Sequence, residues 1–488
     1  MRIFLLLFIS SSLFSGPLED LDKFIQEARI QYNVPGLAVA IVQDDKVIFA
    51  KGYGLCSYNQ KEEVNPNTIF QLASVSKTFT SAGLGVLVDQ KKLTWDDEVI
   101  EHLPLFALKD SYPTRYATSR DLLAHRTGLP SFRGDLLGKL GLTSKELLYR
   151  VRFIEPESSF RNKAFYSNVG FFVAGELLSA LSNTSFEKAI QTSLLSPLKM
   201  HHSGFADNLN NANVASAHAI TEGKIAIIER DKSVQFAAAG GVTSTALDMA
   251  NWMIMHLNDG VFEGKQILKT ETIKQMHAPS MVSEVSFTET LPINDHSSFS
   301  FGLGWNNYNY LGKTIVEKGG ALEGVRTIVT LIEESKMGIV VLTNLNLTLL
   351  PELIRAKFLE TYVGKQEKDL DKEYKISQEK INTLVSAPPK PQNPLPFKGK
   401  LSDCTGSFAN DLYGKVIITK ADDKLILKAG DIQGTLTSYS NNTFMLTWPT
   451  INAGHELITF TFGTEGKAIE FQTETLGTFY SSEAPKNP

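Results

Sequence analysis

A serine and a lysine three positions apart, Ser74 and Lys77, stand at the start of a segment with the pattern of a helix, residues 78–90. On a helix, residues three apart lie on the same face, about one turn from each other. The serine would also lie near the helix N-terminus, where unpaired backbone N–H groups and the helix dipole attract negative charge. A hydroxyl becomes a nucleophile when a neighbouring base takes its proton, and a lysine with a lowered pKa can be that base. The pair alone is a weak signal, because many helices contain it by chance.

Two further motifs follow this pair in order. A Tyr-Ser-Asn element occupies residues 166–168, at a distance that suits a loop meeting the start of a helix in a large α/β domain. Lys318 and Gly320 follow residues 313–317, which have the pattern of a strand with glycines at its end. Glycine at such a place lets a substrate approach the strand backbone closely. Three motifs in this order are far more specific than any one of them.

With these motifs the chain resembles the class C β-lactamase-related serine hydrolases, which also include penicillin-binding-protein-like esterases and D-amino-acid peptidases. The resemblance covers about residues 20–360. Three other stretches support it, at residues 121–130, 239–248 and 301–305. Residues 396–482 resemble the lipocalin-like C-terminal domain that follows this hydrolase domain in some relatives.

The order of predicted elements indicates an α/β fold. A hairpin at the start, a mostly helical region, and further strands over residues 326–343 predict a sheet with helices on its faces plus a helical subdomain. The resemblance implies the same layout, a β-lactamase/transpeptidase-like antiparallel sheet flanked by helices. It also implies an active site in the cleft between the sheet and the helical subdomain, and a small all-β barrel domain after them.

Composition divides the chain into four parts. Residues 1–15 have a basic start, a short apolar core and small residues, the pattern of a secretory signal peptide. Residues 18–363 would form the hydrolase domain. Residues 364–395 are highly charged and then rich in proline, which predicts a stiff, extended linker. Residues 396–488 contain regular short strand patterns with polar turns, which predict an antiparallel barrel or sandwich.

The signal pattern predicts an exported protein, periplasmic or secreted, with no stable membrane span after cleavage. An uncleaved membrane anchor is the alternative, although the apolar run is too short to cross a bilayer comfortably. A net charge of −5 gives no reason to expect nucleic acid or an anionic membrane surface as a partner. For Cys56 and Cys404 we expect two separate thiols, with an interdomain disulfide as the alternative.

The resemblance implies a catalytic role for three residues. Ser74 would be the nucleophile. Lys77 would be the general base or would hold the network that deprotonates the serine. Tyr166 would be a second proton-handling group, whose pKa two nearby ammonium groups would lower.

The remaining motif residues would bind substrate. Asn168 would hydrogen bond the substrate amide or orient the catalytic lysine. Lys318, where many relatives have histidine, would contact a substrate carboxylate, while Glu317 beside it would face away because neighbouring strand residues point to opposite faces. The second N–H of the oxyanion hole, after that of the serine, would come from Ala321 beside Gly320.

Other residues invite competing interpretations. His125 suggests a hydrolase triad, but in the family its surroundings form a structural turn. His201 and His202 are neighbours whose side chains would diverge on regular structure, so we expect no metal site. Trp305 and Phe160 are candidates for cleft walls, with core packing an equal alternative.

The sequence therefore predicts a serine hydrolase that acts through an acyl-enzyme on amide, peptide or ester bonds, as a D-amino-acid peptidase, carboxypeptidase or esterase, without a cofactor. The substrate would be a small molecule or a peptide. A β-lactamase is one alternative, and a non-catalytic penicillin-binding or ligand-binding protein that relies on the barrel is another. A metal-dependent hydrolase is the weakest alternative, and the oligomeric state stays open.

Overall fold

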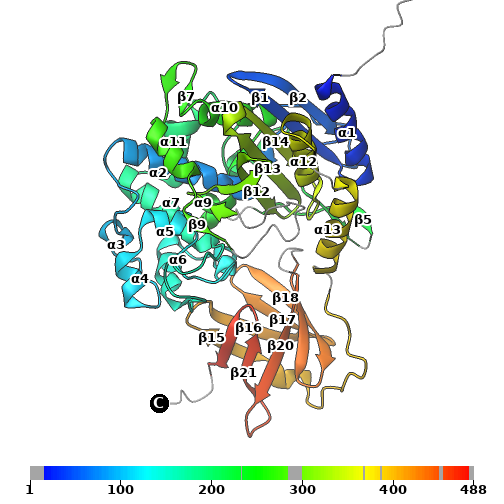
Figure 1. The fold of residues 1–488 in the computed structure, drawn as a ribbon. Coiled ribbons are helices and arrows are strands. Elements are labelled where there is room, and N and C mark those ends of the chain that lie inside the picture. Colours follow the sequence, from blue (N-terminus) through cyan, green and yellow to red (C-terminus); the bar gives the residue numbers. More distant parts are fainter. Residues whose placement is uncertain are drawn as a thin grey trace, which may run out of the picture.

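The computed structural model describes most of the chain and consists of an α/β part and a smaller β-barrel next to it (Figure 1). The predicted signal peptide lies outside the described residues. Among the described helices, none is long and apolar enough to span a bilayer. The described residues are 16–221, 223–231, 234–283, 299–365, 369–384, 387–449 and 454–482.

Eight antiparallel strands form the central sheet: β1 (Gly36–Gln43), β2 (Lys46–Gly54), β9 (Met281–Val282), β10 (Ser300–Phe301), β11 (Asn306–Tyr310), β12 (Lys313–Leu322), β13 (Val325–Ile332) and β14 (Met337–Thr343). Their order is β2-β1-β14-β13-β12-β11-β10-β9. The first strand in the sequence, β1, therefore pairs with β14, the strand of this sheet that comes last in the sequence. The predicted hairpin and the predicted strands over residues 326–343 are confirmed. The glycines after Lys318 lie inside β12 and not at its end.

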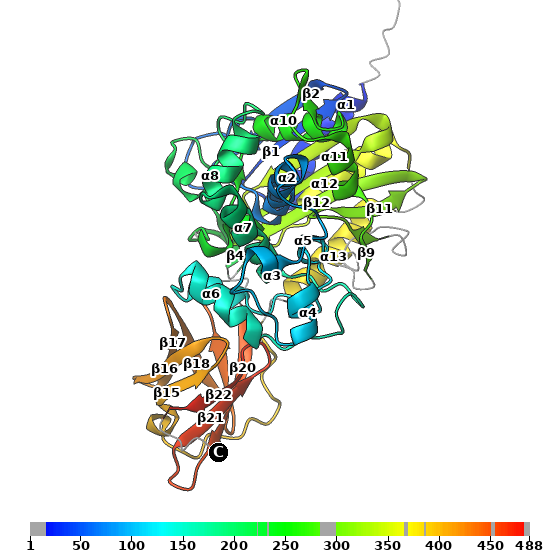
Figure 2. The ribbon, with the colours of Figure 1, turned by 90° about the vertical axis from the view of Figure 1, so that its left-hand side faces the viewer.

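Both faces of the sheet are buried, as β1 illustrates. Its odd-numbered residues from Leu37 to Ile41 pack into one core, and its even-numbered residues from Ala38 to Val42 pack into the other, because side chains alternate along a strand. Helices α1 (Pro17–Gln31) and α12 (Leu350–Tyr362) cover the first face. Helix α10 (Ala246–Leu257) covers the second, and Phe79 of α2 (Ser76–Asp89) stacks on Trp252 of α10 with ring centroids 3.9 Å apart (Figure 2).

The helical subdomain lies beside the second face and surrounds the start of α2 (Figure 2). Its α7 begins where the Ser167 side chain accepts a hydrogen bond from Gly170 N at 3.1 Å, a typical N-cap. Two 3₁₀ turns carry residues that line the cleft, η1 (Ala73–Val75) with Ser74 and η2 (Asp135–Lys139) with Asp135. The other elements between β2 and β9 are β3 (Phe70–Gln71), α3 (Val99–His102), α4 (Ser111–Tyr116), α5 (Ser119–Leu123), α6 (Ser144–Arg150), α7 (Asn168–Ser182), α8 (Phe186–Ile190), β4 (His218–Thr221), β5 (Lys224–Ile227), α9 (Ala237–Gly240), β6 (Thr243–Ser244), β7 (Val261–Phe262), β8 (Lys265–Gln266) and α11 (Thr270–His277).

The predicted extended linker contains a helix, α13 (Leu370–Leu384). Tyr374 is 1% exposed and accepts a hydrogen bond from Arg355 on α12 at 3.4 Å. Leu370 and Ile381 pack against the same core as Tyr374. The expectation of an extended chain over this half of the linker is therefore wrong, because a few apolar side chains at helical spacing hold the charged helix against α12.

The C-terminal part is a closed antiparallel barrel, as predicted, with strands β15 (Gly406–Asn410), β16 (Gly414–Ala421), β17 (Lys424–Ala429), β18 (Ile432–Ser440), β19 (Thr443–Thr447), β20 (His455–Phe462), β21 (Ala468–Thr473) and β22 (Gly477–Ser481). Aromatic rings fill its interior. Phe471 contacts Phe408 and Phe479 with ring centroids 5.2 and 4.7 Å apart, and all three are fully buried. Cys56 and Cys404 are separate buried thiols, which excludes the disulfide.

Candidate active site

Ser74 lies in η1, one short turn before α2, and not in the helix itself. The chain reaches this turn from β3, and Ala73 has a left-handed backbone with φ of +50°. Such a conformation costs free energy in a residue with a Cβ and persists where surrounding contacts enforce it. The sharp turn places the Ser74 side chain at the surface of the cleft, while Lys77 in the first turn of α2 is fully buried behind it.

Three oxygen atoms surround the Lys77 Nζ atom. It lies 3.0 Å from Ser74 Oγ, 2.7 Å from Asn168 Oδ1 and 2.8 Å from the carbonyl oxygen of Ala239. Burial lowers the pKa of Lys77 well below the usual value for lysine, and the positive charge of Lys318 lowers it further. The lysine predicted as general base is thus in contact with the predicted nucleophile.

The contacts of Lys77 also indicate where its lone pair points. A neutral amine has two N–H donors and one lone pair. Ala239 O and Asn168 Oδ1 can only accept hydrogen bonds, so they take the two N–H groups. The lone pair is left for Ser74 Oγ, whose hydroxyl can donate. This is the arrangement that a general base needs.

Asp135 fixes the orientation of Asn168. Asn168 Nδ2 donates to Asp135 Oδ2 at 2.7 Å, so the amide oxygen must face Lys77. Of the two predicted roles for Asn168, the structure supports the orientation of the lysine. Desolvation raises the pKa of Asp135 to about 6, and its Oδ1 atom is buried without a hydrogen-bond partner. Asp135 has no signal in the sequence, because it lies 33 positions before Asn168 and belongs to no motif.

Tyr166 lies over the same group of atoms. Its hydroxyl shares a hydrogen bond with Ser74, and its ring centroid is 4.8 Å from Lys77 Nζ and 5.0 Å from Lys318 Nζ. The expected lowering of the Tyr166 pKa is wrong. Burial raises this pKa well above its usual value, so at neutral pH the phenol keeps its proton. Tyr166 is therefore set up to donate a proton.

Lys318 is the second buried lysine of the site. It is 2% exposed, its Nζ atom lies 3.4 Å from Asn306 Oδ1, and burial lowers its pKa to about 7. Glu317 faces away, as predicted, and accepts hydrogen bonds from Tyr308 at 2.9 Å and from Arg355 at 3.0 Å on the other side of the sheet. Lys318 therefore has its charge directed at the cleft, and its neighbour does not neutralise it.

Gly320 brings β12 against the turn that carries the serine. A Cβ atom on Gly320 would lie 2.4 Å from Leu72 O and 2.9 Å from Ser74 N, so only glycine fits. The Thr327 hydroxyl on β13 donates a hydrogen bond to Leu72 O at 2.8 Å, which links the sheet to the segment that leads into η1. Ala321, next to Gly320, lines the same cavity as Ser74. The proposed pair of N–H groups for an oxyanion thus lies on adjacent segments.

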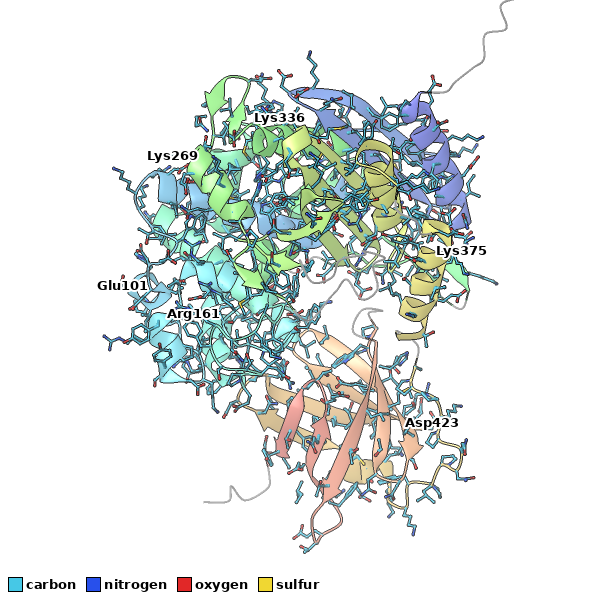
Figure 3. The ribbon with its side chains drawn as sticks, viewed as in Figure 1. Glu101, Arg161, Lys269, Lys336, Lys375 and Asp423 are labelled. Carbon is cyan, nitrogen blue, oxygen red and sulfur yellow. The ribbon has the colours of Figure 1, made fainter. Side chains whose placement is uncertain are left out.

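Several other residues near the motifs have structural roles. His125 Nδ1 accepts from Ser167 N at 3.1 Å, and its ring packs 4.5 Å from the Tyr166 ring, so it supports the tyrosine and is not a triad base. Trp305 is fully buried between core histidines. Arg161 forms an ion pair with Asp121 at 2.8 Å. Arg161 lies in the helical subdomain, whereas Lys375 of α13 lies on the other side of the molecule in the same view (Figure 3).

No group of three His, Cys, Asp or Glu side chains suited to a metal occurs in the described part of the chain. His202 contacts Asp248 at 3.8 Å and is more than half exposed. Phe160 packs against Tyr112 with ring centroids 6.1 Å apart. These observations leave the Ser74 cleft as the place where reactive groups converge.

A cavity of about 1600 Å³ joins the motif residues. Ser74, Tyr166, Asn168, Lys318 and Gly320 line it on the side of the α/β part. The barrel forms another part of the cavity wall, which was not predicted from the sequence. The barrel residues that line the cavity include Tyr413, Trp448, Glu456 and Leu476.

Comparison with known proteins agrees with this architecture. The Beta-lactamase family model matches residues 21–360. A second model, described as Domain of unknown function (DUF3471), matches residues 386–483, so the lipocalin-like nature of the barrel stays a prediction. The chain is 24% identical over 453 residues to the unguisins hydrolase ungD of Aspergillus violaceofuscus (strain CBS 115571), covering 84% of this chain and 78% of that protein.

Protein flp of Staphylococcus aureus (strain N315) is 24% identical over 343 residues, which are 69% of this chain and 65% of that protein. This chain therefore spans just under two thirds of that relative. Among solved structures, the octameric penicillin-binding protein homologue from Pyrococcus abyssi matches with a TM-score of 0.63 and 21% identity, over 95% of this chain and 99% of that one. SurE matches over the same shares with a TM-score of 0.59 and 19% identity. The protein belongs to the beta-lactamase family.

Proposed function

We propose that the protein is a serine hydrolase that cleaves amide bonds of small peptides through an acyl-enzyme on Ser74. One observation carries the proposal: the buried Lys77 Nζ atom lies 3.0 Å from Ser74 Oγ, while its other two contacts are to oxygen atoms that can only accept hydrogen bonds. A lysine kept neutral by burial and by a second cation can accept the serine proton near neutral pH.

Acylation would pass one proton from Ser74 to the leaving amine through Lys77 and Tyr166. Ser74 Oγ bonds to the substrate carbonyl carbon and passes its proton to Lys77 Nζ. The carbonyl electron pair moves onto oxygen, which the backbone N–H groups of Ser74 and Ala321 hold. When the intermediate collapses, the C–N bond breaks. The leaving amine takes the Tyr166 hydroxyl proton, and Lys77 returns a proton to the tyrosine.

Deacylation would repeat these steps with water. The water oxygen attacks the acyl carbon as Lys77 Nζ accepts a proton from it, and the second tetrahedral intermediate uses the same two N–H groups. The bond from the acyl carbon to Ser74 Oγ then breaks, and the serine oxygen regains a proton from the lysine. The enzyme returns to its starting state without a cofactor or a net change of charge.

Lys318 and the relatives support a peptide substrate. A buried ammonium at the cleft suits the carboxylate of a peptide or an amino acid. One relative is named a hydrolase of unguisins, and one matching structure is described as SurE with D-Leu, which makes peptides with D-residues the first substrates to test. Export, as the N-terminal pattern predicts, would place the enzyme where such peptides are met outside the cytoplasm.

A β-lactamase activity is the second candidate, because the same acyl-enzyme chemistry opens a β-lactam ring. The favouring observation is the Ser74, Lys77 and Lys318 set, which combines a nucleophile with a cation for the drug's carboxylate. A binding protein that relies on the barrel is disfavoured, since aromatic side chains such as Phe471 fill the barrel interior.

The intact mass of the protein after brief incubation with benzylpenicillin tests the proposal. We expect a gain equal to the whole drug, absent in Ser74→Ala. Ser76→Ala is the matched control, because Ser76 is fully buried and accepts a hydrogen bond from Val242 N at 2.9 Å, away from the cleft. Hydrolysis of D-leucine p-nitroanilide by the same three proteins then separates peptidase from drug-binding activity. An active Ser74→Ala enzyme would refute the proposal.

A further inference from the structure

The mouth of the barrel forms part of the cavity wall and carries one acidic side chain, that of Glu456. Glu456 is the first interior-facing residue of β20, because Glu456, Ile458 and Phe460 are buried and the residues between them are more exposed. Glu456 lines the cavity, whereas Phe460 packs deeper in the barrel against the rings of Phe408 and Phe471. The Glu456 carboxylate therefore lies at the end of the barrel interior that opens onto the cleft.

Two hydrogen bonds orient this carboxylate. Trp448 Nε1 donates to Glu456 Oε1 at 3.3 Å, and the Thr475 hydroxyl donates to Glu456 Oε2. Each carboxylate oxygen has two lone pairs, so each oxygen can still accept from one further donor. Glu456 is only 9% exposed, so water has little access to these positions. The carboxylate is thus held in place with part of its hydrogen-bonding capacity unused.

No cation of the described part of the chain forms an ion pair with Glu456. Two other buried carboxylates that line the cavity are instead paired with arginines. Glu317 accepts from Arg355 at 3.0 Å, and Glu352 accepts from Arg326 at 2.7 Å. A buried charge without a partner costs free energy, and a cation that enters the cavity from outside would offset that cost.

A short path of contacts joins Glu456 to Tyr166. Thr475, which donates to Glu456, accepts a hydrogen bond from Arg133 Nη1 on its carbonyl oxygen. The preceding residue, Phe132, donates its backbone N–H to Tyr166 O at 3.1 Å, and the rings of Phe132 and Tyr166 lie 5.5 Å apart. Glu456 and Tyr166 also line the same cavity. A substrate in the cleft can therefore contact both the catalytic groups and the barrel mouth.

The surroundings of the Glu456 carboxylate suit a primary ammonium group. Such a group has three N–H donors, which are enough for the two unused acceptor positions. The neighbouring barrel side chains that line the cavity are apolar or aromatic, namely Tyr413, Ile432, Trp448 and Leu476. Side chains of this kind would pack against the carbon chain that carries the ammonium, and aromatic faces attract cations.

We infer that Glu456 is a specificity-determining residue that binds a primary ammonium group of the substrate. The inference rests on the proposed hydrolase function and adds a substrate class to it. The ammonium is either the N-terminal amine of a peptide or the end of a side chain such as that of lysine, since both have the same hydrogen-bonding chemistry. With a carboxylate at Lys318, as proposed above, the cavity would bind a substrate that carries charges of both signs. The barrel would then contribute directly to the choice of substrate.

Four p-nitrophenyl esters test the inference in the full-length enzyme. The esters of D-leucine and N-acetyl-D-leucine differ in the N-terminal ammonium, and those of N-acetyl-D-lysine and N-acetyl-D-norleucine differ in a side-chain ammonium. For each pair, the ratio of kcat/KM for the charged ester to that for the uncharged ester is measured in the native enzyme, Glu456→Gln and Glu465→Gln. Glutamine keeps the shape of Glu456 and can still accept from Trp448. Glu465 is the matched control, an exposed residue in the turn between β20 and β21.

We expect Glu456→Gln to lower this ratio by about 10- to 100-fold in at least one pair, because a hydrogen bond to a charged group is worth roughly that factor. Glu465→Gln should keep the native ratios. The affected pair identifies the ammonium as N-terminal or side-chain, and comparison of ratios cancels differences in the intrinsic reactivity of the esters. Native ratios for both pairs in Glu456→Gln would overturn the inference. An equal fall in Glu465→Gln would also overturn it, because the effect would then come from the net charge of the barrel.

The native enzyme provides a second test that needs no folded variant. The n-butylammonium ion has three N–H donors, whereas tetramethylammonium has the same charge and no N–H donor. At equal ionic strength, n-butylammonium should compete with the preferred ammonium ester, and tetramethylammonium should not. Equal effects of the two salts would overturn the inference. Ester hydrolysis that survives in Ser74→Ala would instead overturn the proposed function, so the two failures are distinguishable.

Discussion

Gly320 and Ser74 belong to segments 246 positions apart, yet a Cβ on the glycine would lie 2.9 Å from the serine backbone nitrogen. The separation leaves no room for any side chain between β12 and the η1 turn. Since the Ser74 N–H is one of the two donors proposed for the oxyanion, the shape of this contact bears directly on catalysis.

Replacement of Gly320 by alanine should therefore lower kcat by about 10²–10³-fold, the effect typical of a lost oxyanion donor. Gly319→Ala is the matched control on the same strand, because its Cβ would meet Thr327 O at 3.8 Å, an ordinary contact. Ester hydrolysis and melting temperature would be measured for both. Equal kcat values in the two variants would contradict the proposed place of the oxyanion.

Lys318 should make substrate binding depend on pH. Its pKa of about 7 means that the ammonium loses its charge as the pH rises through neutrality. KM for a peptide with a free C-terminal carboxylate should rise above pH 7, and KM for the corresponding amide should stay flat. Steady-state kinetics between pH 6 and 9 on the matched pair of peptides would check this. A parallel rise for both peptides would show that Lys318 does not bind the carboxylate.

The same lysine should destabilise the fold. In the unfolded chain a lysine binds its proton up to about pH 10.5, but Lys318 in the fold releases it near pH 7. Between these values the unfolded state binds more protons, so this group's contribution to stability rises with pH and is smallest below pH 7. Lys318→Met should therefore raise the free energy of unfolding at pH 7 by several kcal/mol, on the order of 3–5, with a smaller gain at pH 9. Urea denaturation at the two pH values measures both gains.

A buried ion pair supports the strand behind Lys318. Glu317 and Arg355 are 3.0 Å apart, and each is less than a tenth exposed. Arg355→Met alone should destabilise the protein by about 3–5 kcal/mol, because it leaves the Glu317 carboxylate buried without its partner. Addition of Glu317→Gln should recover part of that loss. Chemical denaturation of the two variants would test this, and a double variant less stable than the single one would argue against the pairing.

The barrel wall should influence which substrates fit. Trp448 lines the cavity that contains Ser74 and donates to Glu456 at 3.3 Å. Trp448→Ala should increase kcat/KM for bulky acyl groups relative to small ones, because it widens the cavity. Tyr480→Ala, at a position 59% exposed on the barrel, should leave this ratio unchanged. The ratio for p-nitrophenyl esters of increasing chain length provides the measurement.

The closeness of the motif residues could be predicted because each pair is local. Ser74 and Lys77 are three positions apart where η1 leads into α2, and Lys318 and Gly320 share one face of β12, so spacing indicates which residues lie together. The pKa of Tyr166 could not be predicted this way. The direction of the pKa shift depends on burial of Tyr166 by groups from several elements. Burial raises the pKa, and this effect is larger than any lowering by the two nearby ammonium groups.

The features that the sequence analysis missed depend on contacts between distant segments. Asp135 acquires its role only when the helical subdomain brings it to Asn168. Helix α13 did carry a signal, since Leu370, Tyr374 and Ile381 share one helical face, but the surrounding charges obscured it. The barrel wall of the cavity had no sequence signal, because docking surfaces have no periodic pattern.

The linker has a consequence for the active site. In the described part of the chain the two thiols are unbonded, so the covalent connection between barrel and hydrolase domain is the backbone after α13. A tether of this kind keeps the barrel at a high effective concentration near its docking site. If a protease cut the chain between α13 and β15, docking would become an encounter between two molecules, and the activity of the enzyme would then depend on its dilution.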